Sequence, residues 1–160
     1  DCHLVEVTSG FAVLNLCGPK ARDVLAGASE SDVSNAAHPF ATCREVVIGA
    51  APVRALRIGY VGELGWELHH PIEYQVHIFD KLMAAGADLG IKPFGIRAMD
   101  CLRIEKSYRL PGRELSIEYA ALESGLDRFV HLDKGDFLGR DALAAWKDRG
   151  SGDWRIHCHV

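Results

Sequence analysis

Apolar and polar residues follow one another along the first part of the chain in a pattern that predicts strands and helices in turn. Residues 11–17, FAVLNLC, form an apolar run bounded by glycines and predict a buried strand. Residues 18–28, GPKARDVLAGA, predict a helix with Pro19 at its first position, where proline is tolerated. Residues 29–43 are rich in Ser, Asp, Asn and Pro, and they predict a loop.

Residues 44–70 predict a run of antiparallel strands, because apolar residues alternate there between glycine-containing turns. The last turn, Gly62-Glu63-Leu64-Gly65, has a common hairpin length. It would place Tyr60 directly opposite Glu67, on the same side of the sheet. The same alternation puts Trp66 on the other side, where we expect it in the core.

The later elements are predicted from changes in apolar periodicity. An amphipathic helix is expected over residues 72–86, with a stripe through Ile72, Val76, Phe79 and either Leu82 or Met83. The other expected elements are a helix over 93–110, a strand over 123–133, and a helix over 139–149 with Gly150 as its C-cap.

A weak internal repeat is visible in these elements. A strand, a glycine turn and a helix occur near residues 10–28 and again near 54–86. Two such units in one sheet predict a duplicated α+β architecture of antiparallel or mixed sheets packed with helices.

Composition and charge narrow the class of protein. The chain has 160 residues, 48% hydrophobic and 25% charged, which is ordinary for a globular domain. A net charge of −4 argues against a nucleic-acid partner, and the sequence has no apolar run of the length that spans a membrane. Five cysteines without a CxxC pair are expected to be reduced and mostly buried, in a cytosol-like compartment. His157 and His159 lack further ligands, so no metal is expected.

Two charged positions are candidates for a role beyond solubility. From spacing alone, Glu67 is favoured as a charge on the wet face of a half-exposed sheet, paired with a cation such as Arg57, because glutamate is mostly exposed. Asp100 and Arg103 are three residues apart, which favours an ion pair on the surface of a helix.

Several longer motifs carry a family resemblance. YVGELGWEL, GIRAMDCLRIEKSYR, LESGL and LDKGDFLGRDAL follow one another, and GPKAR, SNAAHPF and APVRALR extend the match upstream. In this order they resemble the folate-binding domain of the aminomethyltransferase (glycine cleavage T-protein) superfamily. The motif sequences are most similar to the C-terminal part of dimethylglycine and sarcosine dehydrogenases, and the resemblance covers about residues 11–143.

The resemblance implies a fold of interleaved β-β-α-β units and a site for tetrahydrofolate. It implies that Glu67, the last residue of a YxGExGxE motif, accepts hydrogen bonds from the pterin edge, with Tyr60 nearby. The arginine that helps T-proteins bind the folate tail is replaced by Met99, and Arg97 is a possible substitute. Glu123 in LESGL is a second-tier candidate, because this motif lines the site in the superfamily.

The resemblance also implies a longer parent polypeptide. Residues 1–150 would be the folate-binding domain with its N-terminal part missing, and 151–160 the start of a truncated C-terminal β-barrel. The catalytic aspartate of the family and an FAD-binding domain would lie upstream, so no catalytic residue is assigned to this chain. The parent would be an enzyme of one-carbon metabolism, in the cytoplasm or, in a eukaryote, the mitochondrial matrix.

The implied reaction transfers a one-carbon unit from an amine-derived iminium or formaldehyde to form 5,10-methylenetetrahydrofolate. Two alternatives stay open. One is a stand-alone aminomethyltransferase of glycine cleavage or a related folate-dependent demethylase. The other is a non-catalytic folate-binding factor of the iron–sulfur assembly type, although Asp136 stands where that family carries a cysteine.

Overall fold

The computed structural model describes residues 2–149, which divide into two compact units. The first unit reaches Met99 and the second begins at Asp100, and each is described by itself. The first unit contains β1 (Phe11–Cys17), α1 (Ala21–Ala28), β2 (Cys43–Ile48), β3 (Ala51–Leu56), β4 (Gly65–Pro71) and α2 (Gln75–Ala85). It also contains short 3-10 helices at Thr8–Gly10, Ile72–Tyr74 and Ala87–Leu89. Helix α3 (Ile96–Glu105) crosses the boundary, and the second unit contains a 3-10 helix (Asp127–Phe129) and α4 (Arg140–Asp148).

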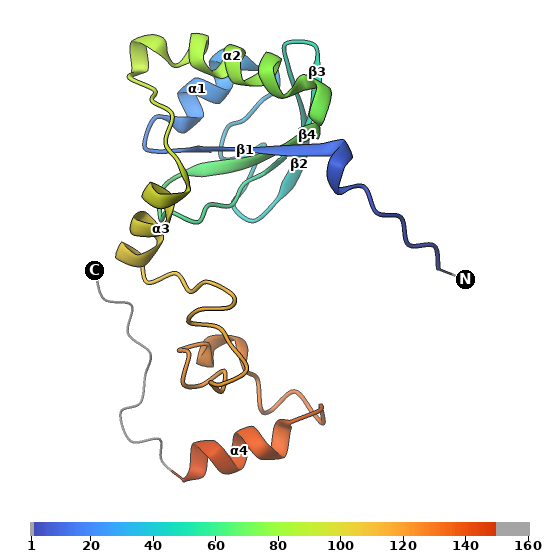
Figure 1. Cartoon of the computed structure of the whole chain (residues 1–160), viewed down its shortest axis with the longest axis vertical. Helices are drawn as coiled ribbons and strands as arrows, with labels where there is room; N and C mark the ends of the chain where they lie inside the picture. The colour runs from blue at the N-terminus through green and yellow to red at the C-terminus, as the bar shows by residue number, and fades with distance from the viewer. Residues whose placement is uncertain (1, 150–160) are drawn as a thin grey trace. The chain divides into compact units, whose positions relative to one another are not determined.

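The first unit is a four-stranded antiparallel sheet with strand order β1-β4-β3-β2. Helices α1 and α2 lie on the same side of this sheet and pack against each other (Figure 1). Strands β1 and β4, each followed by one of these helices, are direct neighbours. The α+β class is therefore confirmed, and the strands of the two strand–helix units lie side by side, with β1 at the edge of the sheet.

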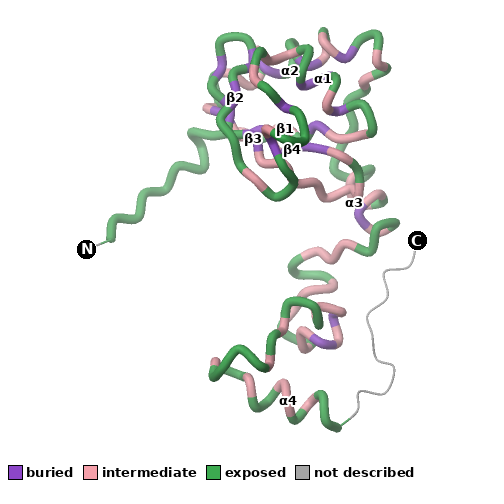
Figure 2. The backbone as a smooth tube through the Cα atoms, turned by 180° about the vertical axis from the view of Figure 1, so that it is seen from behind, coloured by how far each residue is buried: buried purple, intermediate pink, exposed green. Residues whose placement is uncertain are grey.

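Strand alternation divides the sheet into a covered face and an open face. Trp66, Leu68 and His70 of β4 are buried on the covered face, together with Leu16 of β1 and Val53 of β3. Figure 2 shows the buried positions gathered in the sheet and in α1 and α2. The prediction that Trp66 belongs to the core is confirmed, since it is only 1% exposed.

Trp66 lies among cationic and aromatic side chains as well as apolar ones. The guanidinium carbons of Arg22 and Arg57 lie 5.1 and 5.9 Å from its ring centroid, within cation–π range. The buried His38 ring meets it edge-on, with centroids 6.0 Å apart. Burial lowers the pKa of His38, so the core is built around a neutral imidazole.

The predicted tight hairpin between β3 and β4 is wrong. Glu67 is paired with Leu56, so residues 57–64 form a longer loop and Tyr60 is not opposite Glu67. The strands separate because each end continues to pair with its other neighbour. Arg57 exchanges backbone hydrogen bonds with Ala41 and Thr42, whereas Leu64 accepts one from Gly18. The residues of the turn do not show that each end of this segment has another segment with which to pair, so the turn sequence alone could not predict the longer loop.

Helix α2 buries only part of the predicted apolar stripe, because Leu82 is confirmed as buried but the first turns are rotated away from the sheet. Ile78 and Leu82 are the buried residues, whereas Ile72 and Val76 are exposed. Ile78 and Leu82 are four positions apart, so they lie on one face of the helix and pack against the sheet, whereas Phe79 stays partly exposed. Pro19 likewise lies before α1, which begins at Ala21, although the helix itself is confirmed.

The second unit contains less regular structure than predicted. Helix α3 ends at Glu105, well before Pro111, because Ser107 adopts a left-handed conformation with φ of 58°. The predicted strand over 123–133 is wrong. Its backbone groups are used in local bonds, such as Phe129 N–H to Leu126 C=O, and a short 3-10 helix replaces the strand. Helix α4 is confirmed.

Some predictions fall at the ends of the chain. The C-cap at Gly150, the start of a barrel expected over 151–160 and the His157–His159 pair lie outside the described residues. The proposed domain boundary at residue 150 stays a prediction.

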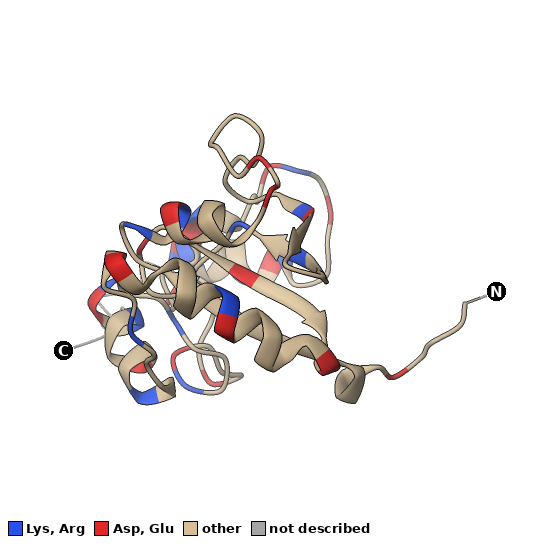
Figure 3. Cartoon of the chain, turned by 90° about the horizontal axis from the view of Figure 1, so that it is seen from above, with Lys and Arg blue, Asp and Glu red and all other residues tan. Residues whose placement is uncertain are grey.

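Among residues 2–149, no helix is both long and apolar enough to cross a bilayer. Lys and Arg are interspersed with Asp and Glu along the ribbon (Figure 3).

Candidate functional site

The open face of the sheet carries Glu67 near the centre of the first unit. Glu67 and His69 project from β4 on the side opposite Trp66 and Leu68. Cross-strand pairing places Asn15 of β1 on one side of Glu67 and Leu56 of β3 on the other. Neither α1 nor α2 covers this face (Figure 1). The sheet therefore presents the carboxylate on a rigid platform that a ligand can approach.

The Glu67 carboxylate is oriented by the neighbouring histidine. His69 Nε2 lies 3.3 Å from Glu67 Oε2, and the two side chains are 34% and 29% exposed. Of the partners left open for Glu67, Arg57 is not the one, because it donates to Asn35 Oδ1 at 2.6 Å and to the His38 carbonyl at 2.8 Å. Within residues 2–149, Glu67 Oε1 has no hydrogen-bond partner. One carboxylate oxygen is thus available to donors from a ligand.

A cavity of about 320 Å³ lies along β1, beside this platform. Residues 13–17 of this edge strand form one wall, and the opposite wall is formed by α2, with Phe79 and Leu82, and by the segment around Phe94, so the cavity lies at the sheet edge between β1 and α2. Its lining is mainly apolar, with a few polar groups, as is common for sites that take small heterocycles. Glu67 does not line the cavity itself, but its cross-strand partner Asn15 does.

Tyr60 reaches the same neighbourhood from the loop between β3 and β4. It lines a second, very small cavity of about 10 Å³ together with Asn15, Phe94 and Met99. The structure therefore relates Tyr60 to Glu67 only through Asn15, rather than by direct opposition. Sequence reasoning missed Asn15. The available signal was an asparagine inside an otherwise apolar strand, where it is unfavourable.

The position of Met99 agrees with its alignment to a ligand-contacting arginine. Met99 lines both cavities. Arg97 is an exposed residue in the first turn of α3, and neither of these two cavities is lined by it. The Met99 position thus borders the candidate site, whereas the role assigned to Arg97 stays a prediction.

Glu123 belongs to the second unit, where it closes a local turn. Its carboxylate accepts a hydrogen bond from Ala120 N–H at 2.7 Å, and the side chain is half-buried. This contact gives Glu123 a structural role, while ligand binding by it stays a prediction.

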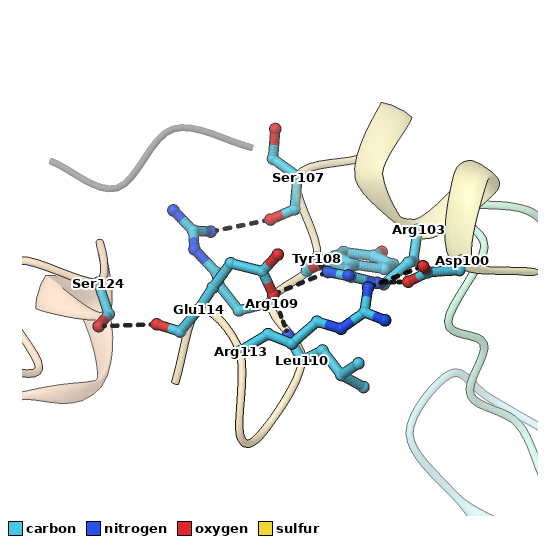
Figure 4. Close-up of polar contacts among 9 residues, drawn as sticks. All are labelled: Asp100, Arg103, Ser107, Tyr108, Arg109, Leu110, Arg113, Glu114 and Ser124. Carbon is cyan, nitrogen blue, oxygen red and sulfur yellow. Dashed lines mark hydrogen bonds and ion pairs between the residues drawn. The ribbon is translucent and has the colours of Figure 1, made fainter. Parts of the chain in front are cut away.

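The second unit also contains a buried arginine that the sequence reading placed on a helix surface. Arg103 is 1% exposed and donates to Asp100 Oδ1 at 2.6 Å and to Glu114 Oε2 at 2.9 Å. It also donates to the Tyr108 carbonyl at 2.9 Å (Figure 4). The predicted pairing with Asp100 is confirmed, but the surface location is wrong.

The electrostatics of this cluster follow from its contacts. Burial opposes the charge of Arg103, yet the hydrogen bonds that it donates to Asp100 and Glu114 outweigh burial and raise the arginine pKa. The pKa of Asp100 is lowered, mainly by the hydrogen bond from Arg103. Burial would raise the pKa of Glu114, but the Leu110 N–H and Arg103 reverse this and lower it. All three groups are held in their charged forms near neutral pH.

The cysteines do not behave as the sequence suggested. Cys2, Cys43 and Cys101 are exposed and Cys17 is half-buried, so the expectation of mostly buried thiols is wrong. Burial, followed by the charge of Glu63, raises the pKa of Cys17 and keeps its thiol protonated beside the cavity. Over residues 2–149, no cluster of three or more His, Cys, Asp or Glu side chains is arranged to hold a metal ion.

Comparison with known proteins agrees with the motifs. Residues 1–134 match the family described as the GCVT N-terminal domain. The chain is 40% identical over 151 residues to the mitochondrial dimethylglycine dehydrogenase of Homo sapiens, covering 94% of this chain and 17% of that protein. It is 40% identical over 152 residues to the mitochondrial sarcosine dehydrogenase of Mus musculus, covering 94% and 16%.

A transferase matches over the same share of this chain. The aminomethyltransferase of Thermoanaerobacter sp. (strain X514) is 36% identical over 150 residues, covering 94% of this chain and 40% of that protein. The chain thus spans less than a fifth of the two dehydrogenases and less than half of the transferase. On the extent of the family match, this chain belongs to the GCVT N-terminal domain family.

Proposed function

We propose that this chain is a tetrahydrofolate-binding module of a folate-dependent one-carbon transferase. The observation that carries the proposal is the Glu67 carboxylate, held by His69 on an open sheet face next to an apolar cavity. The relatives named as aminomethyltransferase, dimethylglycine dehydrogenase and sarcosine dehydrogenase support the same class of chemistry.

The residues present fit the chemistry of a reduced pterin. Its 2-amino group and N3–H are adjacent donors in one plane, which a carboxylate can accept as a two-point, charge-assisted pair. Glu67 provides this acceptor, and the apolar wall of the cavity provides surface for the ring. Bound tetrahydrofolate supplies the N5 and N10 amines that take up the one-carbon unit. The role of this chain is to bind and orient the folate, and such positioning can supply much of a rate enhancement.

In the parent protein, we propose that an amine-derived iminium or formaldehyde is converted to 5,10-methylenetetrahydrofolate. An FAD-binding domain would generate the iminium, and it would lie in a part of the polypeptide outside this chain, as would a C-terminal barrel. Met99 in place of arginine favours this dehydrogenase-like parent over a stand-alone glycine cleavage transferase. Relatives named as mitochondrial favour the mitochondrial matrix if the source is a eukaryote, and the cytoplasm otherwise.

The proposal is tested by titrating tetrahydrofolate into the chain and into a Glu67→Gln variant in a calorimeter. Glutamine turns one acceptor of the pterin edge into a donor and removes the charge. Affinity should fall by about 10- to 100-fold, as expected when a charged hydrogen bond worth about 1.5–3 kcal/mol is lost. Glu45→Gln is the matched control, because Glu45 is an exposed glutamate of the same sheet on β2. Equal affinities of Glu67→Gln and wild type would contradict the proposal.

A further inference from the structure

Asn15 occupies a distinctive place among the residues around Glu67. It is the direct cross-strand partner of Glu67, so their Cβ atoms lie on one face at about 4.5–5.5 Å. It also borders both the 320 Å³ cavity and the small cavity that Tyr60 lines. Asn15 therefore joins the carboxylate to the space where a ligand ring can lie.

The amide of Asn15 has no structural task within the described part of the chain. Among residues 2–149 its side chain makes no hydrogen bond, and the residue is exposed. Asparagine is depleted from strands, where β-branched and aromatic residues are more favourable. Its neighbours Leu14 and Leu16 are apolar and turn toward the covered face. An unpaired amide at this point is available to a ligand.

Together, Asn15 and Glu67 present a defined pattern of hydrogen-bonding groups. The two oxygens of Glu67 are acceptors, and one of them can accept from a ligand while it also accepts from His69. The Asn15 amide adds an N–H donor beside them. The resulting order of acceptor, acceptor and donor is complementary to a ring edge that offers donor, donor and acceptor. A 2-amino-4-oxo heterocycle has this edge, in its 2-amino group, N3–H and O4.

We propose that Asn15 is a specificity-determining residue that donates to the 4-oxo oxygen of the bound ring. The site would thereby select 2-amino-4-oxo heterocycles over their 2,4-diamino analogues. This inference rests on the proposed folate site at Glu67. In a 4-amino analogue, a donor replaces the O4 acceptor and N3 carries no hydrogen. Sites that use buried or ordered polar groups to bind a substrate discriminate strongly against analogues that leave those groups unpaired.

The test compares tetrahydrofolate with 4-amino-4-deoxytetrahydrofolate by calorimetric titration into the full 160-residue chain. The wild type should prefer the 4-oxo compound by about tenfold or more. In Asn15→Leu, which is similar in size and lacks the amide, that preference should fall by about tenfold, with affinity for the 4-amino compound nearly unchanged. Asn15→Asp, which exchanges the donor for an acceptor, should weaken 4-oxo binding and strengthen 4-amino binding.

The controls separate this inference from the function on which it rests. Glu45→Gln should leave the preference at the wild-type value, and circular dichroism should show that each Asn15 variant is folded. If Glu67→Gln weakens tetrahydrofolate binding while both Asn15 variants keep the wild-type preference, the inference is overturned and the folate site stands. If the wild-type chain does not bind tetrahydrofolate at all, both proposals are overturned.

Discussion

The two units of this chain are stabilised by different kinds of interaction. The first unit buries a continuous apolar core between a sheet and two helices, including Leu25, Ile48 and Leu68. In the second unit, Leu122 is the single buried apolar residue within the described range, and the buried charge of Arg103 connects α3 to the segment around Glu114. One unit depends on area removed from water, and the other on a buried arginine that is paired with two carboxylates, Asp100 and Glu114.

This difference explains which parts could be predicted from the sequence. Burial of apolar area leaves a periodic pattern, so residues 11–17 and 65–71 were recognised as strands and Trp66 as core. The burial of Arg103 depends on chain turns after Glu105 that bring Glu114 beside it, and a positive φ at Ser107 sets the first of them. No periodic pattern in the sequence predicts the course of the chain between Glu105 and Glu114.

The candidate site was predictable in part for the same reason. The alternation in β4 correctly placed Glu67 and Trp66 on different faces of the sheet. The neighbours of Glu67, however, depend on which strands pair with each other. Asn15 is more than fifty positions away from Glu67 along the chain, and the pairing of β1 with β4 brings the two together. The same competition among strands removed Tyr60 from its expected place.

The largest expected effect is on the apolar core of the first unit. Leu68→Ala should destabilise this unit by about 2–5 kcal/mol, because Leu68 is fully buried between Leu14 and Ala55 and its removal leaves a cavity. Hydrogen exchange read by mass spectrometry should show faster exchange over residues 11–71 and little change after residue 100. Equal acceleration in both units would contradict the contrast between them.

The next effect tests the polar cluster of the second unit. Arg103→Met should leave Asp100 and Glu114 without their buried partner, and the melting transition of this unit should fall by roughly 10 °C or more. Arg113→Met is the matched control, since Arg113 also bonds Asp100, at 2.9 Å, but is 59% exposed. Exposed pairs contribute little, so a shift of only a few degrees is expected for the control. Similar shifts for both variants would argue against a special role for the buried arginine.

The smallest expected effect is that of pH on stability. As the pH falls, the first unit should lose stability before the second unit does. The folded-state pKa of His38 is lowered by burial, so the first unit binds fewer protons when folded and loses stability as the pH falls below about 6.5. The folded-state pKa values of Asp100 and Glu114 are also lowered, but their contribution is complete above about pH 5 and is lost only as the pH falls below that value.

Hydrogen exchange at a series of pH values checks this order. Between about pH 6.5 and 5, protection should decline in the first unit while the second unit keeps its protection. His38→Gln removes the titrating group, so the decline over that range should become shallower in this variant. Earlier loss of protection in the second unit would contradict the assignment.

The separation of β3 from β4 after Leu56 has a consequence for how this family can vary. The two ends of the 57–64 loop are bonded to different parts of the sheet. Arg57 is bonded to the segment just before β2, and Leu64 accepts a hydrogen bond from Gly18, just after β1. Residues can therefore be added to or removed from the tip without a change in the alignment of Glu67 against Asn15. The segment around Tyr60 can therefore change in length or sequence while Glu67 keeps its place on the sheet.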